Sequence, residues 1–319
     1  MTKYSIFAFV IAFVVCAVMT HFMIPVLHRF KFGQNVRDDG PESHLAKQGT
    51  PTMGGIAIIA AYEIACLPFA IFYHEIVPIM IFSFAFGCIG FLDDYLKIKR
   101  KQSEGLSARA KFALQIVVTA TLAIYIMRFT NIGSSIYIPF TKLSMFNLGA
   151  LYLPFIFIVV LGTDNGVNFT DGLDGLNSCV TMIVALFFGI IALVLQSNTA
   201  VVAWAVMGSL IGFLIYNRYP AKIFMGDTGS LALGGFVSSF ALLNRIPLYI
   251  PIIGFIYMLE VISVIIQVGY FKSSHGKRFF KMAPIHHHFE KCGYNEVRVV
   301  ILFSMITLMF GTLAVIFLL

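Results

Sequence analysis

The sequence predicts an all-α integral membrane protein with about ten transmembrane helices. Hydrophobic residues make up 59% of the 319 residues and charged residues only 12%, whereas about 25% is usual in soluble domains. The polar interruptions between the apolar runs are also too short to bury cores of their own. We therefore expect one membrane domain over residues 1–319 and no separate soluble domain.

The expected spans are apolar runs long enough, or nearly so, to cross about 30 Å of hydrocarbon. The first run is too long for a signal peptide and has no clear small-residue cleavage site, so we keep it as a span. Between the fourth and fifth spans, residues 131–149 alternate β-branched or aromatic residues with small polar ones, which predicts a short external β-hairpin. The runs cover residues 4–27, 53–72, 76–92, 112–128, 149–163, 176–195, 199–217, 229–243, 247–271 and 297–319.

The basic residues indicate the orientation of these spans. All of the 22 Lys and Arg residues except Lys3, Arg128, Lys142 and Arg245 fall on one set of alternate loops. The positive-inside rule places those loops in the cytoplasm and both termini outside. Every Asp falls on the same cytoplasmic side. Because orientation explains the net charge of +7, we expect no nucleic-acid partner.

A polar stretch, residues 165–177, lies between two apolar runs and contains Asp171 and Asp174 but no Lys or Arg. Unpaired carboxylates at the end of a membrane segment are costly unless they meet a metal ion, water or a cation, so they indicate a functional site. Gly172 would allow a ligand to approach the main chain closely. The alternative is a simple helix cap, with Thr170 or Asp171 starting the helix at Leu176.

Two further acidic groups lie on the predicted cytoplasmic side. Asp93 and Asp94 close the third span, and such adjacent carboxylates suit Mg²⁺ that holds substrate phosphates, although a solvated helix end would also explain the pair alone. Asp227 lies between glycines in a loop that opens the eighth span, where a helix N-terminus favours phosphate. Three acidic clusters on one face predict a site for a cation or a metal-bound anion.

Two loops add possible phosphate contacts. Residues 47–55 combine a Lys with hydroxyls and glycines, which can present donors to a nucleotide or form an ordinary Pro/Gly turn. Residues 284–290 contain three consecutive histidines but no His-Glu-x-x-His zinc signature, so a phosphate-contacting role near Mg²⁺ is favoured. Glu63 and Glu260 lie within predicted spans, where a buried carboxyl can stay protonated and bond to a neighbouring helix, and we assign neither a catalytic role. Asp164 also receives no role.

These motifs resemble those of the polyprenyl-phosphate N-acetylhexosamine-1-phosphate transferases. The aspartate motifs are shared across that family, and the triple histidine followed by Phe and Glu is typical of its branch that uses muramoyl-pentapeptide substrates. The resemblance extends over nearly the whole chain. The matching segments are residues 49–55, Asp93-Asp94, residues 105–107 with Lys111, residues 168–176, residues 224–230 and residues 284–290.

The resemblance implies Mg²⁺-dependent transfer of phospho-MurNAc-pentapeptide from UDP-MurNAc-pentapeptide to undecaprenyl phosphate, which gives lipid I and UMP in peptidoglycan synthesis. The enzyme would be a multi-pass protein of the bacterial cytoplasmic membrane, with its site facing the cytoplasm. Its partners would be these two substrates and membrane lipids, and a homodimer is compatible with the resemblance. One diphosphate bond replaces another, so no ATP site is needed, and the sequence has no Gly-x-x-x-x-Gly-Lys-Ser/Thr motif.

The resemblance also implies roles for individual residues. Asp227 would be the principal Mg²⁺ ligand with Asp94 in support, Asp93 a base or orienting group, and Phe224 the platform that stacks on uracil. A bound diphosphate would favour the protonated, donating form of a histidine. The implied catalytic residues are Asp93, Asp94, Lys97, Lys111, Asp227, His286, His287 and His288, and the implied substrate-binding residues are Lys47, Thr52, Asn165, Asn168, Asp171, Gly172, Asp174, Asn217 and Phe224.

Three other functions are weighed against this one. An ion-coupled transporter would hold its acids near the midplane of the membrane, whereas these lie at one boundary. An intramembrane aspartyl protease would need Gly-x-Gly-Asp, but Phe224 stands at the first glycine position. A sister transferase that uses UDP-GlcNAc is the nearest alternative, and only the histidine segment argues against it.

Overall fold

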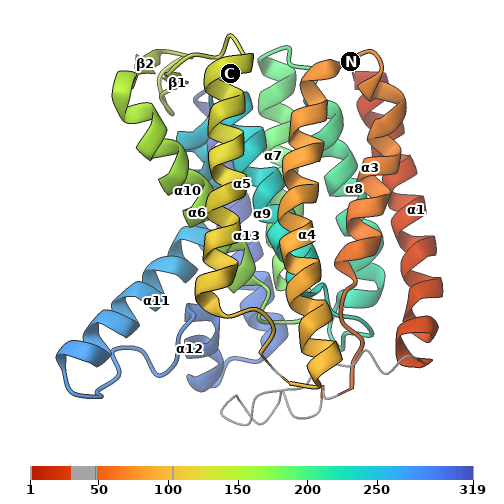
Figure 1. Cartoon of the computed structure of the whole chain (residues 1–319), viewed down its shortest axis with the longest axis vertical. Coiled ribbons are helices and arrows are strands. Elements are labelled where there is room, and N and C mark those ends of the chain that lie inside the picture. Colours follow the sequence, from red (N-terminus) through yellow and green to blue (C-terminus); the bar gives the residue numbers. More distant parts are fainter. Residues whose placement is uncertain (1, 30–46, 48, 103, 319) are drawn as a thin grey trace.

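The computed structural model describes residues 2–29, 47, 49–102 and 104–318. Its helices pack side by side into one bundle, with both termini at the same end (Figure 1). Helix α9 lies inside the bundle, in contact with α3, α4, α6 and α7. The helices are α1 (Thr2–Arg29), α3 (Gly55–Ala70), α4 (Val77–Arg100), α5 (Ala108–Phe129), α6 (Tyr152–Thr170), α7 (Leu176–Val194), α8 (Ala200–Asn217), α9 (Gly226–Leu243), α10 (Ile250–Ile253), α11 (Phe255–Ser273), α12 (Ile285–Lys291) and α13 (Glu296–Ile316).

The all-α membrane fold is confirmed, and each predicted apolar run overlaps at least one helix. Among the described residues, 8 helices are long and apolar enough to cross a membrane, and α3, with 16 residues, is a shorter apolar helix. The run 247–271 is not one straight helix, because the chain breaks at Gly254 between α10 and α11. Below this break α11 leans away from the bundle (Figure 1).

Several helices extend beyond the apolar runs that predicted them, and three of these, α4, α6 and α9, carry residues of the candidate site; α9 begins at Gly226, so Asp227 lies on a helix and not in the predicted loop. Helix α4 continues to Arg100 and α6 to Thr170, so residues expected in loops lie on helices instead. The reason is that polar side chains in these last turns find partners on neighbouring helices, which replace the water that a helix end would otherwise need. Asp94 and Asn168 are examples, because each is hydrogen-bonded to α9 in the candidate site described below.

The predicted hairpin is present between α5 and α6. Strands β1 (Ser135–Tyr137) and β2 (Met145–Asn147) are antiparallel, with Ile136 opposite Phe146. Ile136 is buried in a small apolar cluster that includes residues of α4, α5 and α6. The hairpin lies at the same end of the bundle as the termini (Figure 1).

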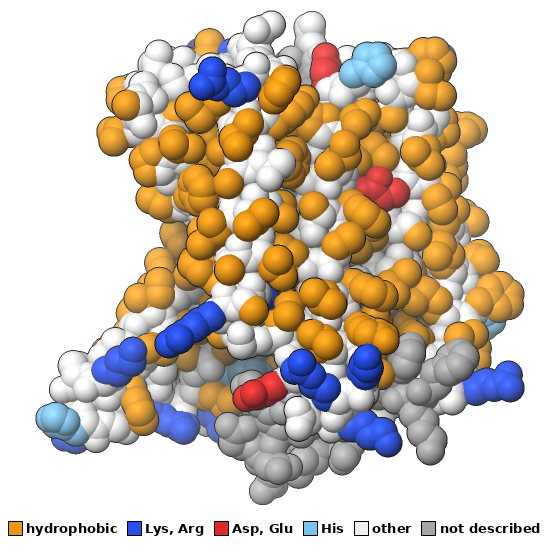
Figure 2. Space-filling view, viewed as in Figure 1, with side chains coloured by type: hydrophobic (Ala, Val, Ile, Leu, Met, Phe, Trp, Pro, Cys, Tyr) orange, Lys and Arg blue, Asp and Glu red, His pale blue; other side chains and the backbone are white. Residues whose placement is uncertain are grey.

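The surface separates apolar and charged side chains. Hydrophobic residues cover the middle of the visible face, and Lys and Arg gather mainly at the end opposite the termini (Figure 2). This pattern is the one the positive-inside rule requires if the basic end faces the cytoplasm. The orientation itself stays a prediction, and Lys31 and Arg37, which counted toward it, lie outside the described residues.

Candidate active site

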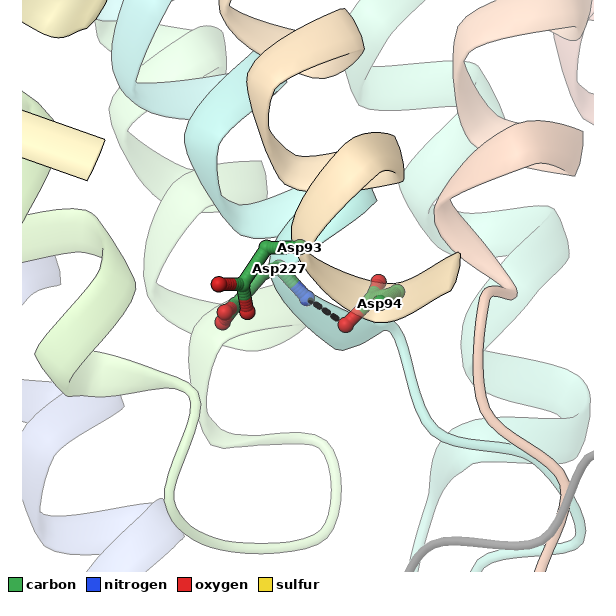
Figure 3. Close-up of side chains that lie close together, drawn as sticks. All are labelled: Asp93, Asp94 and Asp227. Atoms are coloured by element: carbon green, nitrogen blue, oxygen red, sulfur yellow. Dashed lines mark hydrogen bonds between the residues drawn. The ribbon is translucent and has the colours of Figure 1, made fainter. Parts of the chain in front are cut away.

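Three carboxylates from two helices form the centre of the candidate site. Asp93 and Asp94 lie in the last part of α4, and Asp227 lies in the first turn of α9. Each offers one oxygen, and these oxygens lie within 4.8 Å of one another. Figure 3 shows Asp93 beside the Asp227 carboxylate and Asp94 against the backbone of Asp227. Asp94 and Asp227 are 133 residues apart in the sequence, and the packing of α4 against α9 brings them together.

Asp94 holds the beginning of α9. Its carboxylate accepts hydrogen bonds from the backbone N–H of Asp227 at 3.2 Å, from the backbone N–H of Thr228 at 2.9 Å and from the Thr228 hydroxyl at 2.7 Å. These N–H groups have no partner within their own helix, because they belong to its first turn. Asp94 therefore acts as a cap supplied by another helix, and it fixes the backbone from which the Asp227 side chain projects.

Close helix packing places this backbone. A Cβ added at Gly90 of α4 would overlap the backbone carbonyl of Asp227, and one added at Gly55 of α3 would overlap the backbone of Gly229. Only glycine leaves room for these contacts. The position of Asp227 is thus set by main-chain contact with two other helices.

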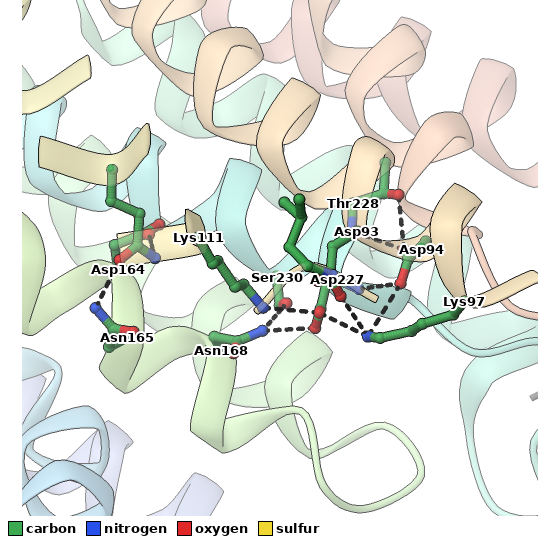
Figure 4. A network of polar contacts seen from close by, with 12 residues as sticks. Asp93, Asp94, Lys97, Lys111, Asp164, Asn165, Asn168, Asp227, Thr228 and Ser230 are labelled. Carbon is green, nitrogen blue, oxygen red and sulfur yellow. Dashed lines mark hydrogen bonds and ion pairs between the residues drawn. The ribbon is translucent and has the colours of Figure 1, made fainter. Parts of the chain in front are cut away.

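Two lysines form ion pairs with the carboxylate cluster. The Lys97 ammonium lies 2.7 Å from Asp227 Oδ2 and 2.6 Å from Asp93 Oδ2, and the Lys111 ammonium of α5 lies 2.8 Å from the same Asp227 oxygen. Asn168 of α6 donates to Asp227 Oδ1 at 2.9 Å and to the Ser230 hydroxyl at 2.8 Å. Figure 4 shows Lys97 of α4, Lys111 of α5 and Asn168 of α6 directed at Asp227. The arrangement provides both oxygen ligands for a cation and ammonium groups for phosphate.

Asp93 is linked to the loop that precedes α5. Its Oδ1 accepts a hydrogen bond from the backbone N–H of Leu106 at 2.8 Å, and Gly105 packs directly on its carboxylate. Ser107 then caps α5 by accepting from the Ala110 N–H. The Gly105–Ser107 motif therefore belongs to the site, where it supports Asp93 and starts the helix that carries Lys111.

A second charged group joins the central loop to the rest of the site. The Lys47 ammonium lies 2.7 Å from Asp174 Oδ1 and 2.6 Å from Glu296 Oε1. Asp174 also accepts from the backbone N–H of Ala221 at 2.8 Å. Burial works against the charged amine, but the two carboxylates outweigh it and raise the pKa of Lys47. This cluster connects four segments that are distant in sequence.

The capping alternative for the central loop is wrong. The N-cap of α7 is Gly175, with φ of 76°, and no side chain caps this helix. Asp171 instead lies in the turn after α6, where burial and then the negative charge of nearby carboxylates raise its pKa well above the ordinary value. A carboxyl in this condition holds a proton more readily than an exposed aspartate and can donate a hydrogen bond.

The loop before α9 pairs with the loop before α3. The Phe224 N–H donates to the Pro51 carbonyl at 2.8 Å, and the Gly54 N–H donates to the Phe224 carbonyl at 2.9 Å. Thr52 lies beside Gly226 on this pair of segments. Phe224 is half-buried.

The side chains of Asn217 and Asn165 form hydrogen bonds with neighbouring residues of the protein. Asn217 is buried; it accepts from the Ser178 hydroxyl and donates to the Ile223 carbonyl, which supports the segment leading to Phe224. Asn165 donates to the Gln115 side chain and to a backbone carbonyl of its own helix, and Figure 4 shows it apart from the three carboxylates. Direct substrate contact by either residue stays a prediction.

The three histidines of α12 have different partners. His286 is buried, and its Nδ1 lies 3.0 Å from Glu260 Oε1. His287 is half-buried, with Nδ1 2.7 Å from Glu290 Oε2. His288 Nδ1 accepts from the backbone N–H of Lys281 at 3.1 Å. Consecutive residues on a helix point in directions about 100° apart, so the three rings have different hydrogen-bond partners, although the ring centroids of His286 and His287 lie 4.1 Å apart.

Sequence reasoning missed two acidic residues of this region. Glu260 was expected only to stabilise a neighbouring helix, yet both of its carboxylate oxygens face the histidine segment. Glu296, which received no role, shares Lys47 with Asp174. For Glu260, the sequence signal of a functional role was a carboxyl inside an apolar run. For Glu296 the only signal was an acid in the first turn of the last span, which also suits an ordinary helix start.

The fold and this site define a class of protein, a membrane-embedded glycosyl transferase. The model of glycosyl transferase family 4 matches residues 76–244, a range that contains all three central carboxylates and both lysines.

More specific similarity is found beyond this class. A signature of phospho-N-acetylmuramoyl-pentapeptide-transferases matches residues 47–59. The chain is 50% identical to the phospho-N-acetylmuramoyl-pentapeptide-transferase of Clostridioides difficile (strain 630) over 96% of this chain and 95% of the relative. The enzymes of the same name from Clostridium novyi (strain NT) and Clostridium perfringens (strain 13 / Type A) are 48% and 46% identical, over 95% and 97% of this chain and 93% and 97% of their own. The chain belongs to the phospho-N-acetylmuramoyl-pentapeptide-transferase family and is a phosphoglycosyl transferase.

Proposed function

We propose that this protein transfers phospho-MurNAc-pentapeptide from UDP-MurNAc-pentapeptide to undecaprenyl phosphate, forming lipid I and releasing UMP in peptidoglycan synthesis. The observation that carries the proposal is the meeting of Asp93, Asp94 and Asp227 with two lysines at the basic end of a membrane bundle. Such a site can receive a soluble nucleotide sugar and a lipid phosphate together. We place it on the cytoplasmic face of the bacterial cytoplasmic membrane.

The residues of the cluster fit Mg²⁺. All the candidate ligand atoms are carboxylate oxygens, and Mg²⁺ prefers oxygen ligands. The ion is commonly held by one or two carboxylates and by substrate phosphates. Asp227 is the expected principal ligand, because its side chain is 18% exposed while those of Asp93 and Asp94 are 3% exposed. Asp94 would support the ion through Oδ1, since its Oδ2 already accepts two bonds from Thr228. When bound, Mg²⁺ offsets the charge of the diphosphate.

The reaction proceeds by direct attack of the lipid phosphate. One of its oxygens forms a bond to the sugar-linked phosphorus, and the bond from that phosphorus to the bridging oxygen breaks, so the bridging oxygen leaves with UMP. A phosphate monoester has a second pKa near 6 and is mostly dianionic at neutral pH. It needs little deprotonation, so Asp93 orients and Lys97 and Lys111 balance phosphate charge. Catalysis is then mainly positioning and charge stabilisation.

Direct attack predicts that the enzyme will not exchange labelled UMP into UDP-MurNAc-pentapeptide when lipid phosphate is absent. A covalent phospho-sugar intermediate on an aspartate would form reversibly without the lipid and would allow that exchange. The measurement is the incorporation of labelled UMP by purified, lipid-depleted enzyme, with undecaprenyl phosphate restored as the positive control. Incorporation in the depleted sample would rule out direct attack.

Phe224 is proposed to stack on the uracil ring, with Lys47, Asp171, Gly172 and Asn217 near the nucleoside. Phe224→Ala is expected to raise KM for the nucleotide substrate about 10- to 100-fold, since base–aromatic stacking contributes about 1–3 kcal/mol, and to leave KM for the lipid unchanged. The matched control is Phe146→Ala, an exposed ring on β2 at the other end of the bundle. A change confined to the KM of the lipid would contradict the stacking.

The substrate test compares two nucleotide sugars. Purified protein with Mg²⁺ and undecaprenyl phosphate is assayed for UMP release from UDP-MurNAc-pentapeptide and, separately, from UDP-GlcNAc. We expect release only from the muramoyl substrate. Release from UDP-GlcNAc alone would identify the sister transferase instead.

A further inference from the structure

Glu260 is a fully buried carboxylate in a membrane helix, and both of its oxygens are directed at α12. Oε2 accepts a hydrogen bond from the backbone N–H of Ile285 at 2.9 Å, and Oε1 lies 3.0 Å from His286 Nδ1. A backbone N–H can only donate, so the carboxylate is held in place from one side. The second oxygen is then an acceptor that faces the imidazole.

The other side of the same imidazole faces the central loop. His286 Nε2 is buried and has no hydrogen-bond partner among the residues that the structure describes. The ring lies directly on Gly172, where an added Cβ would overlap Nε2 and Cε1. Gly172 follows Asp171, whose carboxyl belongs to the same turn. A buried polar atom without a partner is costly, and a ligand bound over this turn would supply one.

We propose that Glu260 is a positioning residue that keeps the proton of His286 on Nδ1 and turns Nε2 toward the nucleotide substrate beside Gly172. This inference rests on the proposed function, because it assumes that the nucleotide binds at the turn of Asp171 and Gly172. The carboxylate accepts from Nδ1–H, and the ring cannot rotate without losing that bond or striking the Gly172 backbone. Glu260 thus acts on the reaction through His286 and does not itself touch substrate.

Glu260→Gln separates this role from simple packing. Glutamine has nearly the same shape but only one acceptor oxygen. If that oxygen still accepts the hydrogen bond from the Ile285 N–H, the glutamine NH₂ group faces His286 Nδ1. Nδ1 must then lose its proton and accept a hydrogen bond from that NH₂ group. The proton moves to Nε2, so the atom presented to the substrate changes its hydrogen-bonding character while the packing stays the same.

The first readout needs no substrate. Nitrogen NMR of the full-length protein labelled at histidine is used to find the protonated nitrogen of His286, identified as the signal missing in His286→Ala. We expect a protonated Nδ1 in wild type and an unprotonated Nδ1 in Glu260→Gln. An unprotonated Nδ1 in wild type would overturn the proposal, whether or not the protein has the proposed activity.

The second readout is turnover with UDP-MurNAc-pentapeptide. Glu260→Gln is expected to lower kcat about 10- to 100-fold, the range found when a residue that orients a metal-bound imidazole is replaced, with little change in KM for the lipid. Gly172→Ala should lower kcat as well, because it displaces the ring while leaving Glu260 intact. Glu63→Gln, a partly buried carboxyl in α3, serves as the matched control and should keep wild-type kcat.

The two possible failures are distinguishable. If wild type releases no UMP from the muramoyl substrate, the proposed function is wrong, and the NMR result still tests the pairing of Glu260 with His286. If wild type is active and Glu260→Gln retains full kcat although its His286 proton has moved from Nδ1 to Nε2, the position of that proton has no part in the reaction. The inference is then wrong.

Discussion

Asp227→Asn is expected to give a folded protein that has lost most of its activity. Asparagine keeps the shape of the side chain and one acceptor for the Asn168 amide, but it removes the charge on which Lys97 and Lys111 converge. It also removes the proposed principal ligand of Mg²⁺. We expect kcat to fall at least about 10²- to 10³-fold, the loss typical when one strong electrostatic contact to a transition state is removed.

The measurement is the initial rate of UMP release over a series of Mg²⁺ concentrations, with thermal unfolding followed in the same detergent. Glu63→Gln is again the control, because it also replaces a carboxyl by an amide in the membrane region and lies outside the cluster. Near-normal turnover with wild-type Mg²⁺ dependence in Asp227→Asn would show that another residue is the principal ligand.

Gly90→Ala should be nearly as damaging, although position 90 carries no reactive group. Its methyl group would have to occupy the place of the Asp227 backbone carbonyl, so α4 and α9 must move apart. That movement separates Asp93 and Asp94 from Asp227. Misplacement by about 1 Å can cost about 100-fold in rate, and overpacking costs about 1–3 kcal/mol of stability.

Gly162→Ala is the matched control for this substitution. Gly162 lies within α6, and an added Cβ there meets no atom within 4 Å. Alanine is favoured over glycine inside a helix by about 1 kcal/mol, so this variant should be fully active and at least as stable as wild type. Equal activity in Gly90→Ala and Gly162→Ala would mean that the contact between α4 and α9 does not set the site.

Part of the candidate site could be predicted because charge inside an apolar sequence is expensive and therefore informative. Asp93, Asp94 and Asp227 were recognisable from their position at the ends of apolar runs. Their detailed roles were not. Asp94 proves to cap α9 from another helix, a relation that depends on which helices pack together and leaves no trace in the local sequence.

The histidine segment shows the same limit. That the three adjacent histidines act on the substrate stays a prediction, but their partners could not be predicted: His286 pairs with Glu260 and His288 with a backbone N–H. The partner of His286 lies 26 residues earlier on α11. No periodicity within either segment indicates that pairing.

The sequence by itself determined that the chain is a helical membrane protein, where its spans lie, that a hairpin joins the fourth and fifth of them, and which polar motifs interrupt them. These properties follow from local hydrophobicity and residue type, because each segment enters the lipid or stays in water according to its own composition. Only the tertiary structure decided that Gly90 and Gly55 leave room for the backbone around Asp227 at the centre of the site. It also decided that Lys47 is shared by Asp174 and Glu296 and that Glu260 faces His286. Those contacts depend on the packing of helices that are distant in sequence, because a buried charge is stable only where the fold brings it a partner.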